Sequence, residues 1–255
     1  MRYAVITGAS SGIGEAFAYE LAARGYHLIL VARRSDALAA IKSKIQQLHD
    51  VEVELGIFDL SNSHDVYALY ETYKSYPVEV LINNAGYGLF GQFHEIELDQ
   101  ELNMMQLNMT TVHSLTKLWL RDFVSRDSGY ILNVASTAAF SAGPLMASYY
   151  ASKAYVLSLT EGIAEELAQA NSQVVVSAFC PGPVATNFQK RAAIGQVGTL
   201  PTPDVVAREA VAELFKRKPI IINGSKNKML IFFNRFIPRK LARVLVYKNQ
   251  LKKNG

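Results

Sequence analysis

The chain has 255 residues and a formal net charge of +4, and half of its residues are hydrophobic. This composition supplies a large core and excludes an intrinsically disordered chain. The single cysteine, Cys180, excludes an internal disulfide and is typical of a reducing compartment, so we expect a cytoplasmic protein. No hydrophobic run approaches the roughly 18 residues of a membrane-spanning helix, and the first residues enter a glycine loop directly, so we expect neither a spanning segment nor a secretory signal.

Strand-like and helix-like patterns alternate along the chain. Short, largely apolar strand patterns occupy 2–7, 27–32, 51–58, 78–83, 130–134, 174–180 and 219–223. Helical patterns occupy 14–24, 36–49, 62–75, 97–125, 148–170 and 203–217. This alternation predicts an α/β fold with a doubly wound (Rossmann-type) parallel sheet of about seven strands, helices on both faces, and one domain over 1–255. The segment 187–203 has no clear period and is predicted to be the most mobile.

The first strand pattern runs into the loop Thr7-Gly-Ala-Ser-Ser-Gly-Ile-Gly14, and a helix pattern follows. Glycines let the backbone turn tightly and approach a pyrophosphate, which the free N–H groups and the dipole of the helix N-terminus favour. The spacing G-x-x-x-G-x-G differs from the common G-x-G-x-x-G, but the loop lies at the first strand-to-helix junction, where such sheets bind ligands. The residues predicted to cradle a dinucleotide are Gly8, Ser10, Ser11, Gly12, Ile13 and Gly14.

The end of the second strand pattern indicates which dinucleotide is bound. NAD-binding proteins usually have an acid about 20 residues after the glycine loop, whereas this chain has Arg33 and Arg34. Both arginines can pair with a 2′-phosphate, with added hydrogen bonds from Ser10 or Ser11, although a solvated basic strand end has the same appearance. Asp36 is better explained as a helix-start residue. We therefore expect NADP(H) rather than NAD(H).

Tyr149 and Lys153 lie at positions i and i+4 of the helix pattern 148–170 and share one face. A free tyrosine, with a pKa near ~10, exchanges protons poorly at neutral pH. A nearby ammonium stabilises the phenolate and lowers this pKa, so the tyrosine can pass a proton to a carbonyl or take one from an alcohol. Tyr150 competes for the role but lies on a different part of the helix surface. Alone, such a pair is usually structural.

Two further polar residues accompany this pair. Ser136 follows the strand pattern 130–134, at the carboxyl end that faces the ligand crevice of a parallel sheet. Its hydroxyl either holds the substrate oxygen beside Tyr149 or serves as an N-cap or turn serine. Asn108 lies mid-helix, where asparagine is a weak helix former. It either binds a water that feeds protons to Lys153 or is an ordinary polar helix residue.

Taken in chain order, these motifs resemble the short-chain dehydrogenase/reductase family. The resemblance covers nearly the first 190 residues, and the set is specific although each motif is weak alone. It implies hydride transfer between a nicotinamide cofactor and a carbonyl or alcohol, and NADPH where basic residues follow the second strand. The matching stretches are the glycine loop Thr7 to Gly14, Asp59-Leu60, Asn83-Asn-Ala-Gly86, Asn108, Ser136, Tyr149-x-x-x-Lys153 and Pro181-Gly-Pro-Val-Ala-Thr186.

The resemblance also implies a role for each matched residue. Tyr149 would be the acid–base group, and Ser136 the anchor of the carbonyl oxygen. Lys153 would bind the ribose and lower the pKa of the tyrosine, and Asn108 would complete the proton relay. The other implied cofactor contacts are Asp59 at the adenine, Thr186 at the nicotinamide amide, and Leu60, Asn83, Ala85, Gly86, Pro181 and Gly182 along the cleft.

The residues flanking these motifs are mostly apolar and favour a lipophilic ketone or aldehyde as substrate. Lys190 and Arg191 either meet an anionic substrate end or are simply exposed. The five histidines are scattered without ligand spacing, so we expect no metal. We expect an NADPH-dependent carbonyl reductase; a 3-oxoacyl-thioester reductase of fatty-acid metabolism and a non-catalytic NADPH-binding regulator are the alternatives. The expected pocket residues are Phe90, Ala138, Phe140, Pro144, Met146 and Phe188.

The C-terminal extension 226–255 is basic and amphipathic, and Pro238 is predicted to split it into two helices. Of the 26 lysines and arginines, 12 lie in 216–255, which has no acid, so 14 bases face all 22 acids in 1–215. The extension can pack on the acidic body of the same or another subunit, cap the substrate cleft, or lie on an anionic membrane. We favour packing, expect no nucleic-acid partner, and take from the family resemblance a homodimer or homotetramer.

Overall fold

The computed structural model describes residues 1–186, 188 and 200–252. Within them, seven strands form one parallel sheet in the order β3-β2-β1-β4-β5-β6-β7. The predicted sheet is confirmed, and each strand boundary lies within two residues of its expected place. The strands are β1 (Tyr3–Thr7), β2 (His27–Ala32), β3 (Val53–Ile57), β4 (Val78–Asn83), β5 (Tyr130–Val134), β6 (Val175–Cys180) and β7 (Ile220–Ile222).

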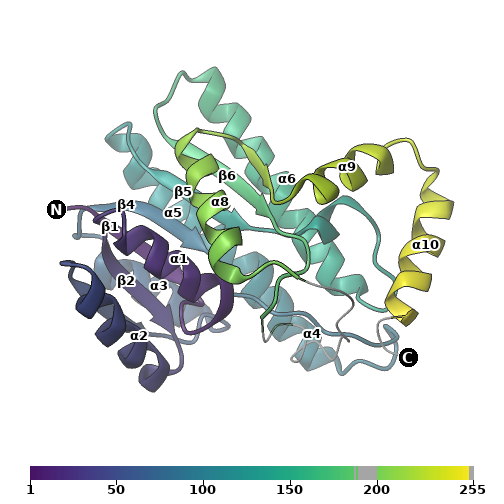
Figure 1. The fold of residues 1–255 in the computed structure, drawn as a ribbon, viewed down its shortest axis with the longest axis horizontal. Helices are drawn as coiled ribbons and strands as arrows, with labels where there is room; N and C mark the ends of the chain where they lie inside the picture. Colours follow the sequence, from purple (N-terminus) through teal and green to yellow (C-terminus); the bar gives the residue numbers. More distant parts are fainter. Residues whose placement is uncertain (187, 189–199, 253–255) are drawn as a thin grey trace.

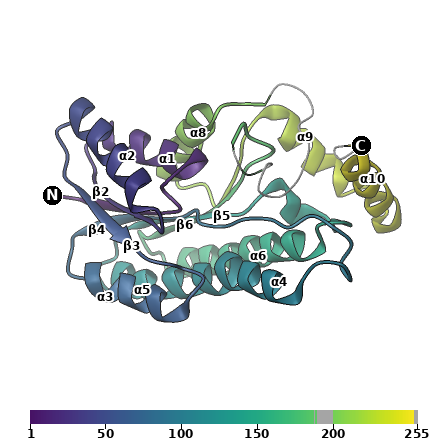
Figure 2. The same ribbon diagram turned by 90° about the horizontal axis from the view of Figure 1, so that it is seen from below.

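Helices cover both faces of this sheet (Figures 1 and 2). The first face carries α1 (Gly12–Ala22), α2 (Ser35–Leu48) and α8 (Pro203–Phe215). The second face carries α3 (Ser63–Tyr73), α4 (Leu98–Met105), α5 (Val112–Ser125) and α6 (Ala147–Gln169). A separate hydrophobic cluster fills the space on each face. Burial on both faces explains why the central strands are almost continuously apolar. Each buried aliphatic side chain contributes about 1.5–3 kcal/mol to the free energy of folding.

The strand order places a crevice beside β1. The chain moves outward from β1 to β2 and β3, then returns to the other side of β1 to form β4. Because the connections after β1 and β4 leave in opposite directions, a cleft opens at their carboxyl ends, which is where open α/β sheets bind ligands. The glycine loop follows β1, so the fold brings it to this cleft.

One expected helix contains a π-helical turn. The pattern 97–125 forms α4, a π-helical turn η1 (Gln106–Thr111) and α5. The predicted helical stretch is confirmed, and its π-helical middle turn contains Asn108, whose side chain is fully buried and hydrogen-bonded. Such π-bulges often occur at functional sites.

The C-terminal extension forms α9 (Ser225–Asn234) and α10 (Arg239–Lys252), divided near Pro238 as predicted. Both helices lie at one end of the molecule (Figures 1 and 2). Among their described residues, only Ile231 and Gln250 are buried. An ion pair of 3.7 Å joins Lys228 to Glu209 of the acidic body. Packing on the same chain therefore occurs at these points, whereas most of the other large apolar side chains of the two helices are exposed, and packing on another subunit stays a prediction.

None of the described helices combines the length and the hydropathy that a membrane-spanning segment needs. Most of the predicted mobile segment 187–203 falls outside the described residues, as do Lys190 and Arg191.

Candidate active site

The glycine loop forms a backbone cradle at the N-terminus of α1. Gly8 and Gly12 have φ angles of 66° and 64°, a region that favours glycine. At Gly14, a Cβ atom would lie 2.3 Å from the carbonyl oxygen of Gly8, so only glycine allows the helix to pack this closely on the loop. The N-cap residue Ser11 makes no side-chain cap hydrogen bond. The first N–H groups of α1 are thus available to an anion, and the cradle fits the pyrophosphate of a dinucleotide.

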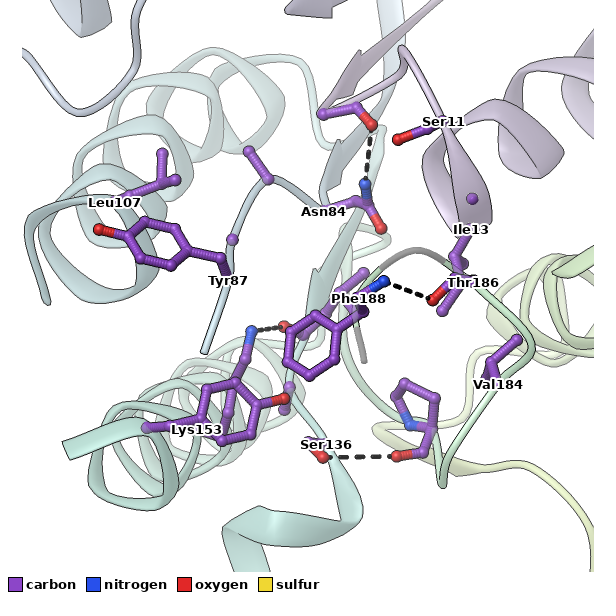
Figure 3. A pocket seen from close by; sticks show the side chains of 18 of the residues that line it. Ser11, Ile13, Asn84, Tyr87, Leu107, Ser136, Lys153, Val184, Thr186 and Phe188 are labelled. Atoms are coloured by element: carbon purple, nitrogen blue, oxygen red, sulfur yellow. Dashed lines mark hydrogen bonds between the residues drawn. The ribbon is translucent and has the colours of Figure 1, made fainter. Parts of the chain in front are cut away.

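A cavity of about 690 Å³ extends from this cradle across the carboxyl ends of the central strands. Figure 3 shows Ser11 and Ile13 at one side of it and Ser136 and Lys153 at another. Its size lies within the range of small-molecule and cofactor sites. The expected site residues that line it are Gly8, Ser10, Ser11, Gly12, Ile13, Arg33, Arg34, Asp59, Leu60, Ala85, Gly86, Ser136, Tyr149, Lys153, Pro181, Gly182 and Thr186.

Asn83 corrects the expected cleft lining. Its side chain is buried and its Nδ2 donates to Thr116 Oγ1 at 3.1 Å and to Asn133 Oδ1 at 2.9 Å. Successive residues at the end of a strand point to opposite faces, so the neighbouring Asn84 lines the cavity instead. Asn84 Nδ2 donates to the carbonyl oxygen of Thr7 at 3.0 Å and ties β4 to the glycine loop. The expectation that Asn83 lines the cleft is therefore wrong, and Asn84 takes that place.

The two arginines after β2 lie at the cradle end of the cavity. Arg34 Nη2 donates to the carbonyl oxygen of Ser10 at 3.0 Å and to Ser10 Oγ at 3.1 Å. Arg33 Nη1 lies 3.5 Å from Asp59 Oδ2; the Arg33 side chain is largely exposed, and that of Asp59 is about half-buried. Burial alone would raise the pKa of Asp59, but hydrogen bonds from Ser61 and the charge of Arg33 outweigh it and lower this pKa. The Asp59 carboxylate thus stays ionised beside the two arginines. Guanidinium groups of this kind can bind a phosphate such as the 2′-phosphate of NADP(H).

Ser136, Tyr149 and Lys153 meet at the other part of the cavity. Tyr149 and Lys153 come from one face of α6, and both are more than nine-tenths buried. Ser136 Oγ accepts a hydrogen bond from the N–H of Ala138 at 3.1 Å, which makes it the N-cap of the short helix η2 (Thr137–Phe140). The same hydroxyl lies 3.5 Å from the carbonyl oxygen of Pro181 (Figure 3). Both interpretations of Ser136, as cap and as cavity residue, are therefore compatible.

The pKa values of this group differ from the expectation. Burial raises the pKa of Tyr149 to about 12, against the opposing effect of a hydrogen bond with Ser136. Burial lowers the pKa of Lys153 to about 8. Lys153 Nζ donates to the carbonyl oxygen of Val134 at 2.8 Å and lies 5.9 Å from the centre of the Tyr149 ring. The expected lowering of the phenol pKa is wrong in this arrangement, because desolvation outweighs an ammonium that is directed elsewhere.

Asn108 holds the loop after β4 against α6. Its Oδ1 accepts from the N–H of Tyr87 at 3.1 Å, and its Nδ2 donates to the Tyr87 carbonyl oxygen at 2.9 Å and to Ser152 Oγ at 3.2 Å. A Cβ atom at Gly86 would lie 2.8 Å from Asn108 Oδ1, so the loop requires glycine there. Asn108 does not line the cavity itself, and its expected part in a proton relay stays a prediction.

The substrate end of the cavity is apolar in part. Of the six expected pocket residues, Ala138, Met146 and Phe188 line it. Phe90 packs behind this wall, in the cluster that contains Met146. Tyr87 and Gln250 also line the cavity and were missed. Tyr87 directly follows the recognised Asn83-to-Gly86 motif, whereas no sequence signal connects Gln250 to a site formed about a hundred residues earlier.

Comparison with known proteins places this geometry in a family. The sequence profile of the short chain dehydrogenase family matches residues 2–196. The chain is 30% identical over 190 residues to hydroxysteroid dehydrogenase-like protein 1 of Gallus gallus, covering 73% of this chain and 57% of that protein. It is 32% identical over 215 residues to the very-long-chain 3-oxoacyl-CoA reductase of Anas platyrhynchos, covering 82% and 67%. It is 31% identical over 175 residues to the 7beta-hydroxysteroid dehydrogenase of Clostridium sardiniense, covering 69% and 67%. The chain thus spans between about half and two thirds of these relatives.

Two solved structures carry the same fold with a nicotinamide cofactor in place. The short-chain dehydrogenase of Sphingobium yanoikuyae in complex with NADPH has a TM-score of 0.84 and 29% identity, over 92% of this chain and 94% of that one. A short-chain dehydrogenase/reductase of Burkholderia phymatum in complex with NAD has a TM-score of 0.84 and 27% identity, over 95% of both chains. With the family profile, the shared fold and the assembled cleft in agreement, this chain belongs to the short-chain dehydrogenase/reductase family of oxidoreductases.

Proposed function

We propose that this protein is an NADPH-dependent reductase of lipophilic ketones or aldehydes. The observation that carries the proposal is one continuous cavity with Arg33 and Arg34 at one part and Ser136, Tyr149 and Lys153 at another. Family membership alone does not establish turnover, because one relative, from Homo sapiens and 30% identical, is named an inactive hydroxysteroid dehydrogenase-like protein. The proposal therefore depends on the chemistry of these side chains.

NADPH is supported by the charge around the cradle. Arg34 is held by Ser10, and Arg33 faces Asp59, so two guanidinium groups lie beside the cradle and would hold a 2′-phosphate. No acid replaces them at the end of β2, where a ribose hydroxyl would be recognised in an NAD-binding protein. The solved relatives include both an NADPH and an NAD complex, so the arginines are the specific argument for NADPH.

The reduction uses three side chains in distinct roles. When bound, the reduced nicotinamide supplies the hydride that goes to the carbonyl carbon. Ser136 Oγ holds the carbonyl oxygen, and the Tyr149 hydroxyl donates the proton that this oxygen needs as negative charge develops on it. The raised pKa of Tyr149 keeps it in the acid form at neutral pH. Lys153 keeps its positive charge below about pH 8 and favours the phenolate that remains.

An apolar wall favours a lipophilic substrate. Ala138, Met146 and Phe188 line the cavity near Tyr149, and the Tyr149 and Phe188 ring centres lie 5.5 Å apart. The relative named 7beta-hydroxysteroid dehydrogenase supports a bulky apolar ketone. The relative named as a very-long-chain 3-oxoacyl-CoA reductase supports the second candidate, a 3-oxoacyl-thioester reductase. The assembled catalytic group disfavours a regulator without turnover, which has no need of it.

The deciding experiment is NADPH consumption by the purified protein with ketones, aldehydes, quinones and acyl thioesters. We expect turnover with bulky apolar ketones. Preference for 3-oxoacyl thioesters would move the assignment to the second candidate. NADPH binding without turnover of any compound in the panel would contradict the reductase proposal and favour the non-catalytic NADPH-binding regulator.

We also propose a homodimer or homotetramer that covers the exposed apolar faces of α9 and α10. Charge complementarity supports a second copy as the occupant, because 216–255 carries 12 bases and no acid while 1–215 has an excess of acids. We expect Phe233→Ser with Leu245→Ser to lower the mass measured by light scattering to that of one chain. An unchanged mass, or binding of the parent to anionic vesicles as a monomer, would contradict this assembly. The exposed side chains are Met229, Leu230, Phe232, Phe233, Phe236, Leu241, Val244, Leu245, Tyr247 and Leu251.

A further inference from the structure

Gln250 is set apart from the rest of the C-terminal extension. It is the one buried residue among the described residues of α10, with an exposed fraction of 3%. Its neighbours Asn249 and Leu251 are exposed. Gln250 also lines the same cavity as Ser136 and Tyr149, about a hundred residues earlier in the chain. The extension, which stands at the edge of the molecule in Figure 1, thus contributes one polar side chain to the active-site cleft.

The orientation of the Gln250 amide follows from its two contacts. Nε2 donates to the Tyr150 hydroxyl at 2.9 Å and to Met146 Sδ at 3.6 Å. A thioether sulfur accepts hydrogen bonds but donates none, which favours the orientation with Nε2 toward Met146. The Tyr150 ring in turn meets the Tyr149 ring edge-on, with centres 6.2 Å apart. Gln250 is therefore held one side chain away from the proposed proton donor.

The other half of the amide has no partner. Gln250 Oε1 is buried and makes no hydrogen bond with any described residue. Buried amide oxygens are normally satisfied, because leaving one unpaired forfeits its bond to water. Of the two side chains that contact the amide, the Met146 thioether has no donor, and the Tyr150 hydroxyl accepts from Nε2 rather than donating to Oε1. An unpaired acceptor on a residue that lines a cavity is suited to a ligand that brings its own donor.

We propose that Gln250 Oε1 is a substrate-binding acceptor that takes a hydrogen bond from a hydroxyl group of the substrate other than the reacting one. The inference rests on the proposed function and narrows its substrate to an apolar ketone that carries a second hydroxyl. A ketone without this hydroxyl leaves Oε1 unpaired, and a site that hydrogen-bonds a hydroxyl discriminates against the analogue that lacks it. Gln250 acts here as a specificity residue, and the reaction itself proceeds at Tyr149.

The test compares a hydroxylated steroid ketone, epiandrosterone, with the same ketone lacking its hydroxyl group. The parent should prefer epiandrosterone by about tenfold or more in kcat/KM, with the difference mainly in KM. Gln250→Met, which keeps length and loses the amide, should remove this preference by raising the KM for epiandrosterone to about that for the deoxy ketone. Asn249→Met, the same replacement at the exposed neighbour, is the matched control and should keep the preference.

Calorimetry of both ketones in the presence of NADP⁺ separates this inference from the proposed function. Hydroxyl-dependent binding that Gln250→Met abolishes supports the acceptor even if NADPH is never consumed, in which case the reductase proposal fails alone. Equal binding of the two ketones by the parent, binding of neither, or a preference that survives in Gln250→Met overturns the acceptor. The Tm of each variant shows that the fold is intact.

Discussion

Lys153 Nζ lies 5.9 Å from the centre of the Tyr149 ring and donates its hydrogen bond to the Val134 carbonyl oxygen. Burial raises the pKa of Tyr149 to about 12 and lowers that of Lys153 to about 8. At neutral pH the phenol therefore holds its proton while the amine is still charged. This combination suits protonation of a carbonyl oxygen better than removal of a proton from an alcohol.

The two directions of the reaction should consequently respond to pH in different ways. We expect ketone reduction to be flat up to about pH 8 and to decline above it, as Lys153 loses its charge. A raised phenol pKa means that the base form appears only at high pH, so alcohol oxidation should rise as the pH approaches the value of about 12 for Tyr149. Steady-state rates in both directions at saturating cofactor test this. Oxidation that is fastest in acid would contradict it.

Arg34 should determine the choice of cofactor. Arg34→Ala removes a guanidinium that the Ser10 hydrogen bonds hold at the cradle. Since a hydrogen bond to a charged group contributes about 1.5–3 kcal/mol, we expect the KM for NADPH to rise about 10- to 100-fold. The KM for NADH should hardly change. Arg121→Ala, an exposed arginine on α5, is the control, and an equal effect of Arg34→Ala on both cofactors would argue against 2′-phosphate recognition.

Gly14 should tolerate no side chain. In Gly14→Ala the new Cβ would lie 2.3 Å from the Gly8 carbonyl oxygen, a backbone atom that can move only with the loop. We expect NADPH binding to be lost and Tm to fall. Gly162→Ala places the same methyl group on α6 with nothing within 4 Å, so it should raise stability by about 0.5–1 kcal/mol. Calorimetric titration and thermal unfolding of both variants distinguish the two outcomes, and normal NADPH binding by Gly14→Ala would refute the cradle.

The sequence predicts the sheet well because the signals are local. The apolar strands 27–32, 78–83 and 130–134 appear with the expected bounds, since burial on both faces leaves a continuous hydrophobic run. Glycine spacing likewise indicates the cradle, because the constraint is on the backbone itself. Both features can be read from a few neighbouring residues.

The remaining features depend on tertiary structure and were predicted less well. A shift of one residue decides that Asn84 rather than Asn83 faces the cleft. The π-helical turn at Asn108 forms around contacts with Tyr87, more than 20 residues away. Gln250 enters the cavity only through the path of α10. The raised pKa of Tyr149 reflects burial, which the i to i+4 spacing from Lys153 does not reveal.

The proposed reduction depends most on Tyr149 as the proton donor, and Tyr149→Phe tests this role most directly. NADPH affinity measured by calorimetry, together with the single-turnover rate of ketone reduction, separates binding from chemistry. We expect near-normal affinity and a rate reduced by about 10²- to 10⁴-fold, the usual contribution of a general acid. Tyr150→Phe should retain most of the activity. A Tyr149→Phe protein that reduces the ketone as fast as the parent would contradict the mechanism.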